Sequence, residues 1–240
     1  MPNNRYLYGG NTIKNNHMYW ILFIGVAVLS YVVQASFQKN FTKASQVPLL
    51  NGMAGREVAL KMLSDHGIHD VKVTSTPGQL TDNFNPTNKT VNLSEAVYSQ
   101  DNVAAAAVAA HECGHAVQHA TGYLPVKIRS ALVPVVSVSS RLVPIVLLVG
   151  MLLINVFPKI LWIGIGLFAL TTLFSFVTLP VEIDASRRAL AWMDQTGVID
   201  PSNENEARGA LRAAAYTYVV GALSSLATLI YYITVFGRRS

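Results

Sequence analysis

Long apolar stretches alternate with polar segments along the chain, and the apolar stretches are of membrane-spanning length. A helix needs about 20 mostly apolar residues to cross a bilayer. This criterion predicts four spans, at 19–35, 142–157, 160–179 and 214–236. Only Pro158 and Lys159 separate the second span from the third, which predicts a helical hairpin. For the first stretch a secretory signal peptide is the alternative, because Arg5 and Lys14 precede it.

The polar segments divide the rest of the chain into tails, a domain and a short helical segment. They are a tail at 1–18, a domain at 36–130, an interfacial helix that leads into the second span within 131–157, a helical segment at 180–213 and a tail at 237–240. Roughly a hundred residues is the size of a small folded domain. We therefore expect the chemistry in the domain at 36–130.

The pattern within this domain predicts both helices and strands. A helix is expected over 54–66, and alternating apolar and polar residues at 71–75 and 89–94 predict two strands. A turn at 86–88 would join them into a small sheet or hairpin. A long Ala-rich helix then begins near Asn102, with Asp101 as its N-cap and Gly122 as its stop.

The composition supports a membrane protein. Of the 240 residues 51% are hydrophobic and only 13% are charged, and the mean hydropathy is +0.36, outside the usual soluble range. The single cysteine, Cys113, excludes an internal disulfide. We interpret it as a small packing residue rather than a nucleophile.

The motif HECGH, residues 111–115, lies within the long predicted helix. Residues four apart project from one face of an α-helix, so His111 and His115 can bind one ion while Glu112 stands beside them. This is the H-E-x-x-H pattern, in which two imidazoles bind Zn²⁺ and the carboxylate takes a proton from the water on the metal. Two surface histidines on an amphipathic helix are the alternative. The neighbouring residues Ala109, Ala110 and Gly114 are small and leave room for another element to pack close to the metal.

A catalytic zinc site needs a third protein ligand. His119 is eight residues from His111, which on a continuous helix is about 12 Å, so the two cannot bind the same ion. The natural candidate is Glu182, in the polar segment after the third span, although a carboxylate there could also merely complement a helix dipole.

The segment around Glu182 predicts a new helix after the third span, which Pro180 is expected to end. One face of this helix carries Glu182, Ala185, Ser186 and Ala189. Asp184 points away from this face. It is the second candidate ligand, or a partner for Arg187 or Arg188.

Membrane topology supports the pairing of Glu182 with the motif. The predicted hairpin supplies two crossings between them, so both lie on one side of the membrane. That side carries twelve Lys and Arg residues against five on the other. The positive-inside rule then places the active site in the cytoplasm and both termini outside. Membrane orientation thus explains the net charge of +5 without nucleic acid.

Several long segments resemble the YugP-type family of bacterial membrane zinc metallopeptidases. They are VAAHECGHAVQHATGYLPVKIRSALVPV, LPVEIDASRRAL and LRAAAYTYVVGALSSL, together with SQVPLLNGMAGREVALKMLSDHGIHDVKV and GQLTDNFNPTNKTVNLSEAVY. The resemblance covers nearly all of the chain from about Tyr19. It implies a mainly α integral membrane protein with about four transmembrane helices and a cytoplasmic α+β zincin-like (gluzincin) domain, in the bacterial inner membrane.

The resemblance also implies roles for individual residues. His111, His115 and Glu182 would bind one Zn²⁺, and Glu112 would be the catalytic base. More distantly the chain is similar to the HtpX and CAAX-prenyl peptidases, whose third-ligand helix reads E-x-x-A-D. Here Ser186 stands where those relatives have the aspartate, so the residue that supports the ligands is either Ser186 or Asp184.

The expected reaction is hydrolysis of a peptide bond by a zinc-activated water. Candidate donors to the developing oxyanion are Arg187, Arg188, Arg212, Tyr216 and Tyr218. The segment 79–93 could offer a strand edge to an extended peptide, or be an ordinary hairpin.

Other features leave alternatives open. Arg141 interrupts an apolar run and is expected at the membrane interface, with a buried charge near the site as its alternative. An intramembrane protease is disfavoured, because the apolar run before His111 is short and no L-D-G motif follows. A catalytically silent zinc-binding adaptor or scaffold remains the rival to the peptidase. Expected partners are a peptide or protein substrate and the lipid bilayer, with a membrane partner subunit or a homo-oligomer left open.

Overall fold

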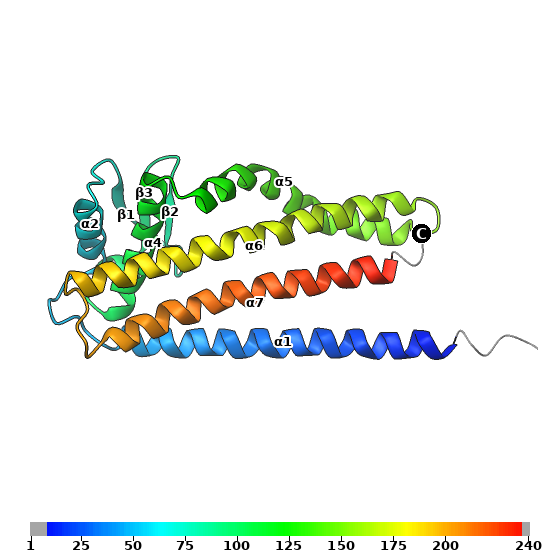
Figure 1. Ribbon diagram of the computed structural model, residues 1–240, viewed down its shortest axis with the longest axis horizontal. Helices are drawn as coiled ribbons and strands as arrows, with labels where there is room; N and C mark the ends of the chain where they lie inside the picture. Colours follow the sequence, from blue (N-terminus) through cyan, green and yellow to red (C-terminus); the bar gives the residue numbers. More distant parts are fainter. Residues whose placement is uncertain (1–8, 237–240) are drawn as a thin grey trace, which may run out of the picture.

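Four long helices run along the length of the molecule, and a small α/β part packs at one end of them (Figure 1). The computed structural model describes the backbone of residues 9–236 and the side chains of residues 20–236. The long helices are α1 (Gly9–Ser45), α5 (Leu124–Leu152), α6 (Pro158–Gln195) and α7 (Glu204–Phe236). Each contains an apolar stretch long enough to cross a membrane. The mostly helical fold with four such helices is as predicted; residues 1–8 of the expected N-terminal tail and the C-terminal tail at 237–240 lie outside the described residues.

The small part at the end of the bundle comes from the polar segment between α1 and α5. Its elements are α2 (Gly55–Asp65), β1 (Lys72–Thr76), β2 (Asn83–Asn85), β3 (Thr90–Ser94), α3 (Glu95–Ser99) and α4 (Val103–Ala120). The apolar face of α2, including Val58 and Met62, packs with Val91 and Leu93 of the central strand and with the alanines of α4 in one buried core. The helix predicted at 54–66 and the strands predicted at 71–75 and 89–94 are confirmed.

The sheet has the order β1-β3-β2. β1 pairs with β3 in parallel, so these two strands do not form a hairpin. The hairpin joins β2 to β3 instead, with Phe84 opposite Val91, and the turn between them is stabilised by Asn85, whose Oδ1 accepts a hydrogen bond from the Thr87 backbone. The pattern did not predict β2 as a separate strand, because three residues are too few to alternate visibly, but the hairpin that was one alternative for 79–93 is confirmed.

The N-cap of helix α4 is one residue later in the sequence than predicted. The side chain of Asn102 accepts a hydrogen bond of 2.9 Å from the Ala105 backbone, so Asn102 is the N-cap and the prediction of Asp101 is wrong. Gly122, with a φ of 66°, follows the end of the helix as expected.

Two predicted helix boundaries are also wrong. α6 continues through Pro180 to Gln195 as one helix. A proline inside a helix costs about 3 kcal/mol, but the residues after it, such as Val181 and Ala185, are fully buried, and we attribute the continuation to this packing. Likewise α5 continues through Pro134 and Pro144 as one helix, without a break between the segment expected at the membrane interface and the second predicted span.

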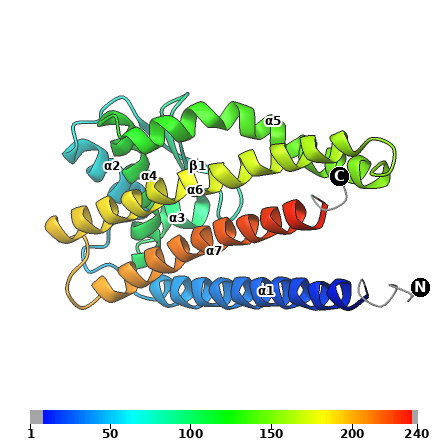
Figure 2. The same cartoon turned by 45° about the vertical axis from the view of Figure 1, so that its right-hand side comes forward.

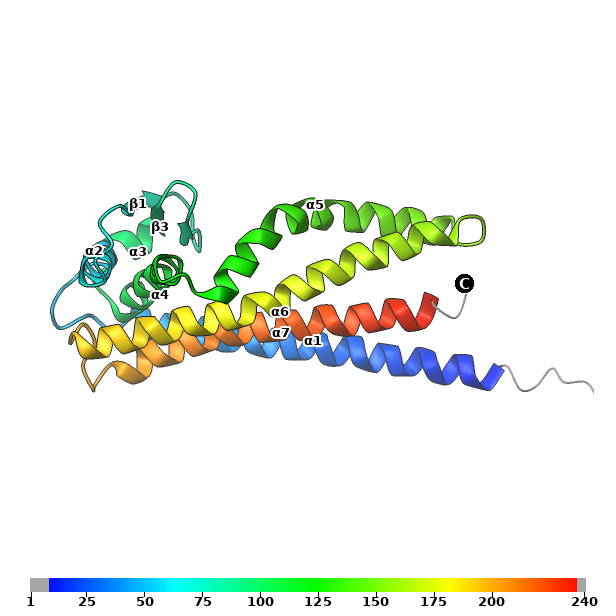
Figure 3. The same cartoon turned by 45° about the horizontal axis from the view of Figure 1, so that its top comes forward.

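α5 arches away from α6 and returns to it near the connecting turn (Figure 3). Its exposed residues include most of the segment 131–142. Arg141 is among them and lines neither cavity at the site described below. The alternative of a buried charge near the site is therefore wrong.

The returning limb of α5 packs closely on α6 because both helices carry glycine at the contact. A β-carbon at Gly150 would lie 2.6 Å from the Cα of Leu161, and one at Gly164 would lie 2.8 Å from the Leu147 side chain. Glycine at such positions lets two helices approach closely within a membrane.

We predict that Gly150→Ala lowers the free energy of unfolding by about 1–3 kcal/mol, because the new methyl group meets the α6 backbone. The matched control is Gly166→Ala, where a β-carbon meets nothing within 4 Å, and its unfolding temperature should be unchanged or slightly raised. Thermal unfolding in detergent, followed by circular dichroism, measures both. Equal unfolding temperatures for the two variants would contradict the close packing.

Candidate metal centre

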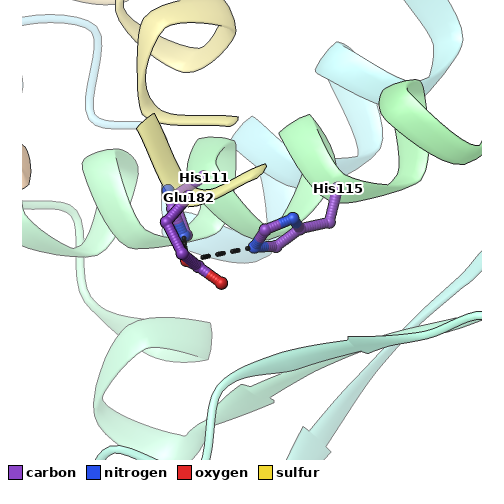
Figure 4. Close-up of side chains that lie close together, drawn as sticks. All are labelled: His111, His115 and Glu182. Carbon is purple, nitrogen blue, oxygen red and sulfur yellow. Dashed lines mark hydrogen bonds and ion pairs between the residues drawn. The ribbon is translucent and has the colours of Figure 1, made fainter. Parts of the chain in front are cut away.

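His111 and His115 of α4 and Glu182 of α6 point toward one another (Figure 4). The Nε2 atom of His111 lies 3.2 Å from Oε2 of Glu182, and Nε2 of His115 lies 3.5 Å from the same oxygen. One ligand atom from each residue can be chosen so that all lie within 4.8 Å of one another. The side chain of Glu182 is only 3% exposed, so the site is a buried cluster of two imidazoles and a carboxylate.

These distances fit zinc. Zinc binds His and carboxylate ligands at about 2.0–2.2 Å in a tetrahedral arrangement, which separates the ligand atoms by roughly 3.3 Å. Two imidazoles and one carboxylate leave the fourth position open, as catalytic zinc sites require. His119 is not part of the cluster; its ring packs 5.3 Å from that of Phe84.

The two helices can meet here because of a glycine inside the motif. A β-carbon at Gly114 would lie 2.7 Å from the carbonyl oxygen of Ala185 and 3.1 Å from its Cα. The backbones of α4 and α6 are therefore in direct contact one turn away from Glu182. Glu182, Ala185, Ser186 and Ala189 are all buried, so the predicted face of this helix is confirmed.

Gln118 holds His115 in the form that can bind a metal. Its amide nitrogen donates to the Val181 carbonyl and to Asp184, at 2.8 and 3.0 Å. This leaves Oε1 of Gln118 to accept from Nδ1 of His115 at 3.1 Å. When the Nδ1 proton is donated to Gln118, the neutral ring keeps the lone pair of Nε2 for a metal ion.

Ser186 contacts His111 in a similar position, because its hydroxyl lies 3.1 Å from Nδ1 of that ring and orients it. Asp184 faces away from the cluster and pairs with Arg187 and Arg188, as one of the sequence alternatives states. Both Ser186 and Asp184 therefore support the cluster. Ser186 contacts His111 directly, and Asp184 acts on His115 through Gln118.

Arg129, from the first turns of α5, binds the oxygen of Glu182 that faces away from the histidines. Its guanidinium donates to Oε1 at 2.9 Å, while Oε2 faces both imidazoles. Sequence reasoning missed this residue as well as Gln118. Arg129 had no signal beyond its charge near a span; Gln118 had one, as a polar residue one turn after His115 on a helix otherwise rich in apolar residues.

Glu112 is buried, with 9% of its surface exposed, and it lines the two cavities that open on the cluster. Burial opposes a charge on His115, but the carboxylates of Glu182 and Glu112 outweigh it and raise its pKa. Burial lowers the pKa of His119 and raises that of the Cys113 thiol. A neutral, fully buried thiol is a packing group, not a nucleophile.

The structure separates the other predicted site residues. Arg212 and Tyr216 bond to each other at 3.1 Å, and neither lines a cavity at the cluster. Arg187 and Arg188 are paired with Asp184. Of the candidate oxyanion donors, only Tyr218 lines both cavities beside Glu112.

Comparison with known proteins agrees with this geometry. A family described as "Putative neutral zinc metallopeptidase" matches residues 19–237. The chain belongs to this family. It is also 38% identical over 219 residues to "Putative membrane protease YugP" of Bacillus subtilis (strain 168), covering 91% of this chain and 96% of the relative. No solved structure matches the chain. The family name implies zinc, and the cluster of two histidines and a glutamate is a place that could hold it.

We predict that Gln118→Leu weakens zinc binding by about 10–100-fold, the usual cost of losing a residue that orients a metal-binding histidine. His119→Leu is the matched control on the same helix and should bind zinc as the parent does. Competition with a chromophoric chelator measures the affinity of each purified protein. A loss caused by His119→Leu but not by Gln118→Leu would overturn the ligand assignment.

Proposed function

We propose that this protein is a membrane-embedded zinc metallopeptidase of the H-E-x-x-H gluzincin type. His111, His115 and Glu182 hold the metal, and Glu112 is the general base. The observation that carries the proposal is the meeting of a buried carboxylate from α6 with both histidines of the motif, at 3.2 and 3.5 Å. Family membership supports the same reaction class.

Zinc, when bound, supplies Lewis-acid polarisation of a carbonyl and makes water acidic enough to lose a proton near neutral pH. The chain's own residues do the rest. Glu112 accepts the proton at its carboxylate and can return it to the leaving amine. Tyr218, beside it in both cavities, is the candidate donor to the oxyanion.

The larger cavity at the site, of about 540 Å³, favours an extended peptide as substrate. It is lined on one side by residues 82–87, which include β2. β3 pairs with one edge of β2, and in the part of the chain that the structure describes no strand pairs with the other edge. A peptide could therefore lie along this edge and hydrogen-bond to the backbone groups of β2 that face away from β3, those of Phe84.

A catalytically silent zinc adaptor would keep the ligands but have no use for Glu112. We predict that Glu112→Gln keeps one zinc per chain and lowers the cleavage of an unfolded reporter protein at least about a hundredfold. Glu95→Gln, an exposed glutamate on α3, is the matched control and should cleave normally. If all three proteins bind zinc and none of them cleaves the reporter, the result would favour the adaptor.

We also propose that the metal centre faces the cytoplasm and that the turn between α5 and α6 faces the opposite side. The excess of Lys and Arg on the side of the motif supports this orientation. Both the motif and the charged start of α7 lie at the end of the bundle opposite this turn (Figure 1).

In intact bacterial cells, a membrane-impermeant maleimide should label Asn155→Cys and leave Ser99→Cys unlabelled until the cells are opened. Both positions are exposed, and the native Cys113 is buried, so the parent provides the background. Labelling of Ser99→Cys in intact cells, with Asn155→Cys protected, would reverse the orientation.

A further inference from the structure

Two cavities of different character meet at the metal centre. The cavity along β2, described above, is lined mostly by polar residues, and we call it the polar cavity. The second, of about 200 Å³, lies between α1, α4, α6 and α7 and is lined mainly by apolar residues. The two cavities share Asp82, His111, Glu112, Glu182 and Tyr218. Whatever occupies the apolar cavity is therefore in contact with the catalytic groups.

The walls of the apolar cavity combine aromatic rings with very small side chains. Phe37 and Phe41 of α1 form one side. The facing helix α7 runs beside α1 (Figures 1 and 2) and contributes Ala210, Ala214 and Ala215. The alanines leave open a space that larger residues on α7 would fill.

We propose that this cavity is the specificity pocket of the peptidase and that it binds one large apolar side chain, such as Leu, Met or Phe, next to the bond that is cleaved. The inference rests on the proposed function, because it names the substrate class of that same site. The backbone of the substrate would lie in the polar cavity along β2, and one of its side chains would enter the apolar cavity past Glu112.

The size of the cavity agrees with such an occupant. An apolar cavity of about 150 Å³ is large enough to hold benzene, so about 200 Å³ accommodates a phenyl ring or a branched aliphatic chain. Each methylene placed in a fitted apolar pocket changes selectivity by about tenfold or more. A lipid chain is the other apolar molecule that could enter between membrane helices, but His111, Glu112 and Glu182 form part of the wall, and these polar groups favour a peptide.

The first test maps every cut that the parent makes in an unfolded reporter protein by mass spectrometry. We expect Leu, Met or Phe at one constant position beside the cut. Ala214→Leu narrows the cavity and should reduce these cuts at least about tenfold, while cuts with Ala, Ser or Gly at that position continue. The matched control is Ala27→Leu, the same change at an exposed position of α1, which should keep the parent's preference. Phe37→Ala widens the cavity and should extend the preference to Trp.

The second test measures binding without cleavage. In the zinc-loaded Glu112→Gln background, a hydroxamate with an isobutyl side chain should raise the unfolding temperature at concentrations at least about tenfold lower than its methyl analogue, because it carries three more apolar carbons. Adding Ala214→Leu should bring this ratio to about one, and zinc content reports that the variant is folded.

The two tests separate the inference from the proposed function. The pocket would be overturned if cleavage shows no preference for an apolar residue, or if Ala214→Leu leaves the preference unchanged. Either result would still support the peptidase. A hydroxamate ratio that collapses in the variant, in a protein whose parent cleaves nothing, would support the pocket and contradict the peptidase. If both hydroxamates bind equally to the Glu112→Gln protein, the pocket would be overturned, and a lipid chain would be the remaining occupant of the cavity.

Discussion

The backbone contact between α4 and α6 at Gly114 and Ala185 is the constraint on which the metal centre depends. A glycine in the third position after His111 lets α6 lie directly against the motif. Only at this distance can the short side chain of Glu182 reach both imidazoles. The supporting hydrogen bonds of Ser186 and Gln118 also cross this contact. A larger residue at Gly114 would separate the ligands and the residues that orient them at the same time.

The requirements of a bilayer explain how two segments about seventy residues apart arrive at this contact. α5 and α6 form a hairpin of two apolar helices, packed through Gly150 and Gly164. The second half of α6 therefore lies at the same end of the bundle as α4 and the start of α5. Arg129 near the start of α5 and Glu182 in the second half of α6 form an ion pair between the two helices of this hairpin. The hairpin thus positions Glu182 beside the two histidines, and Arg129 binds its second oxygen.

The surroundings of the metal centre are shared between the small α/β part and the long helices. The sheet contributes an edge strand and a polar cavity, whereas α1 and α7 contribute the apolar cavity. Neither part encloses the site alone. This division is the physical reason that the proposed substrate combines an extended backbone with a large apolar side chain.

The sequence by itself determined the local features of this protein. Span lengths, the helix around 54–66 and the motif follow from periodicity and composition, which act within one element. The spacing of His111 and His115 places them on one helix face for the same reason, and the predicted helical hairpin brings Glu182 back to them. Only the tertiary structure decided what depends on packing between elements. The helix continues through Pro180 although a proline disfavours it, and its buried face accounts for this. β1 pairs with β3 in parallel, and β3 forms its hairpin with β2, a strand too short to show a pattern. The contacts of Gln118 and Arg129 join residues more than fifty positions apart, and no periodicity within a single helix encodes such a contact.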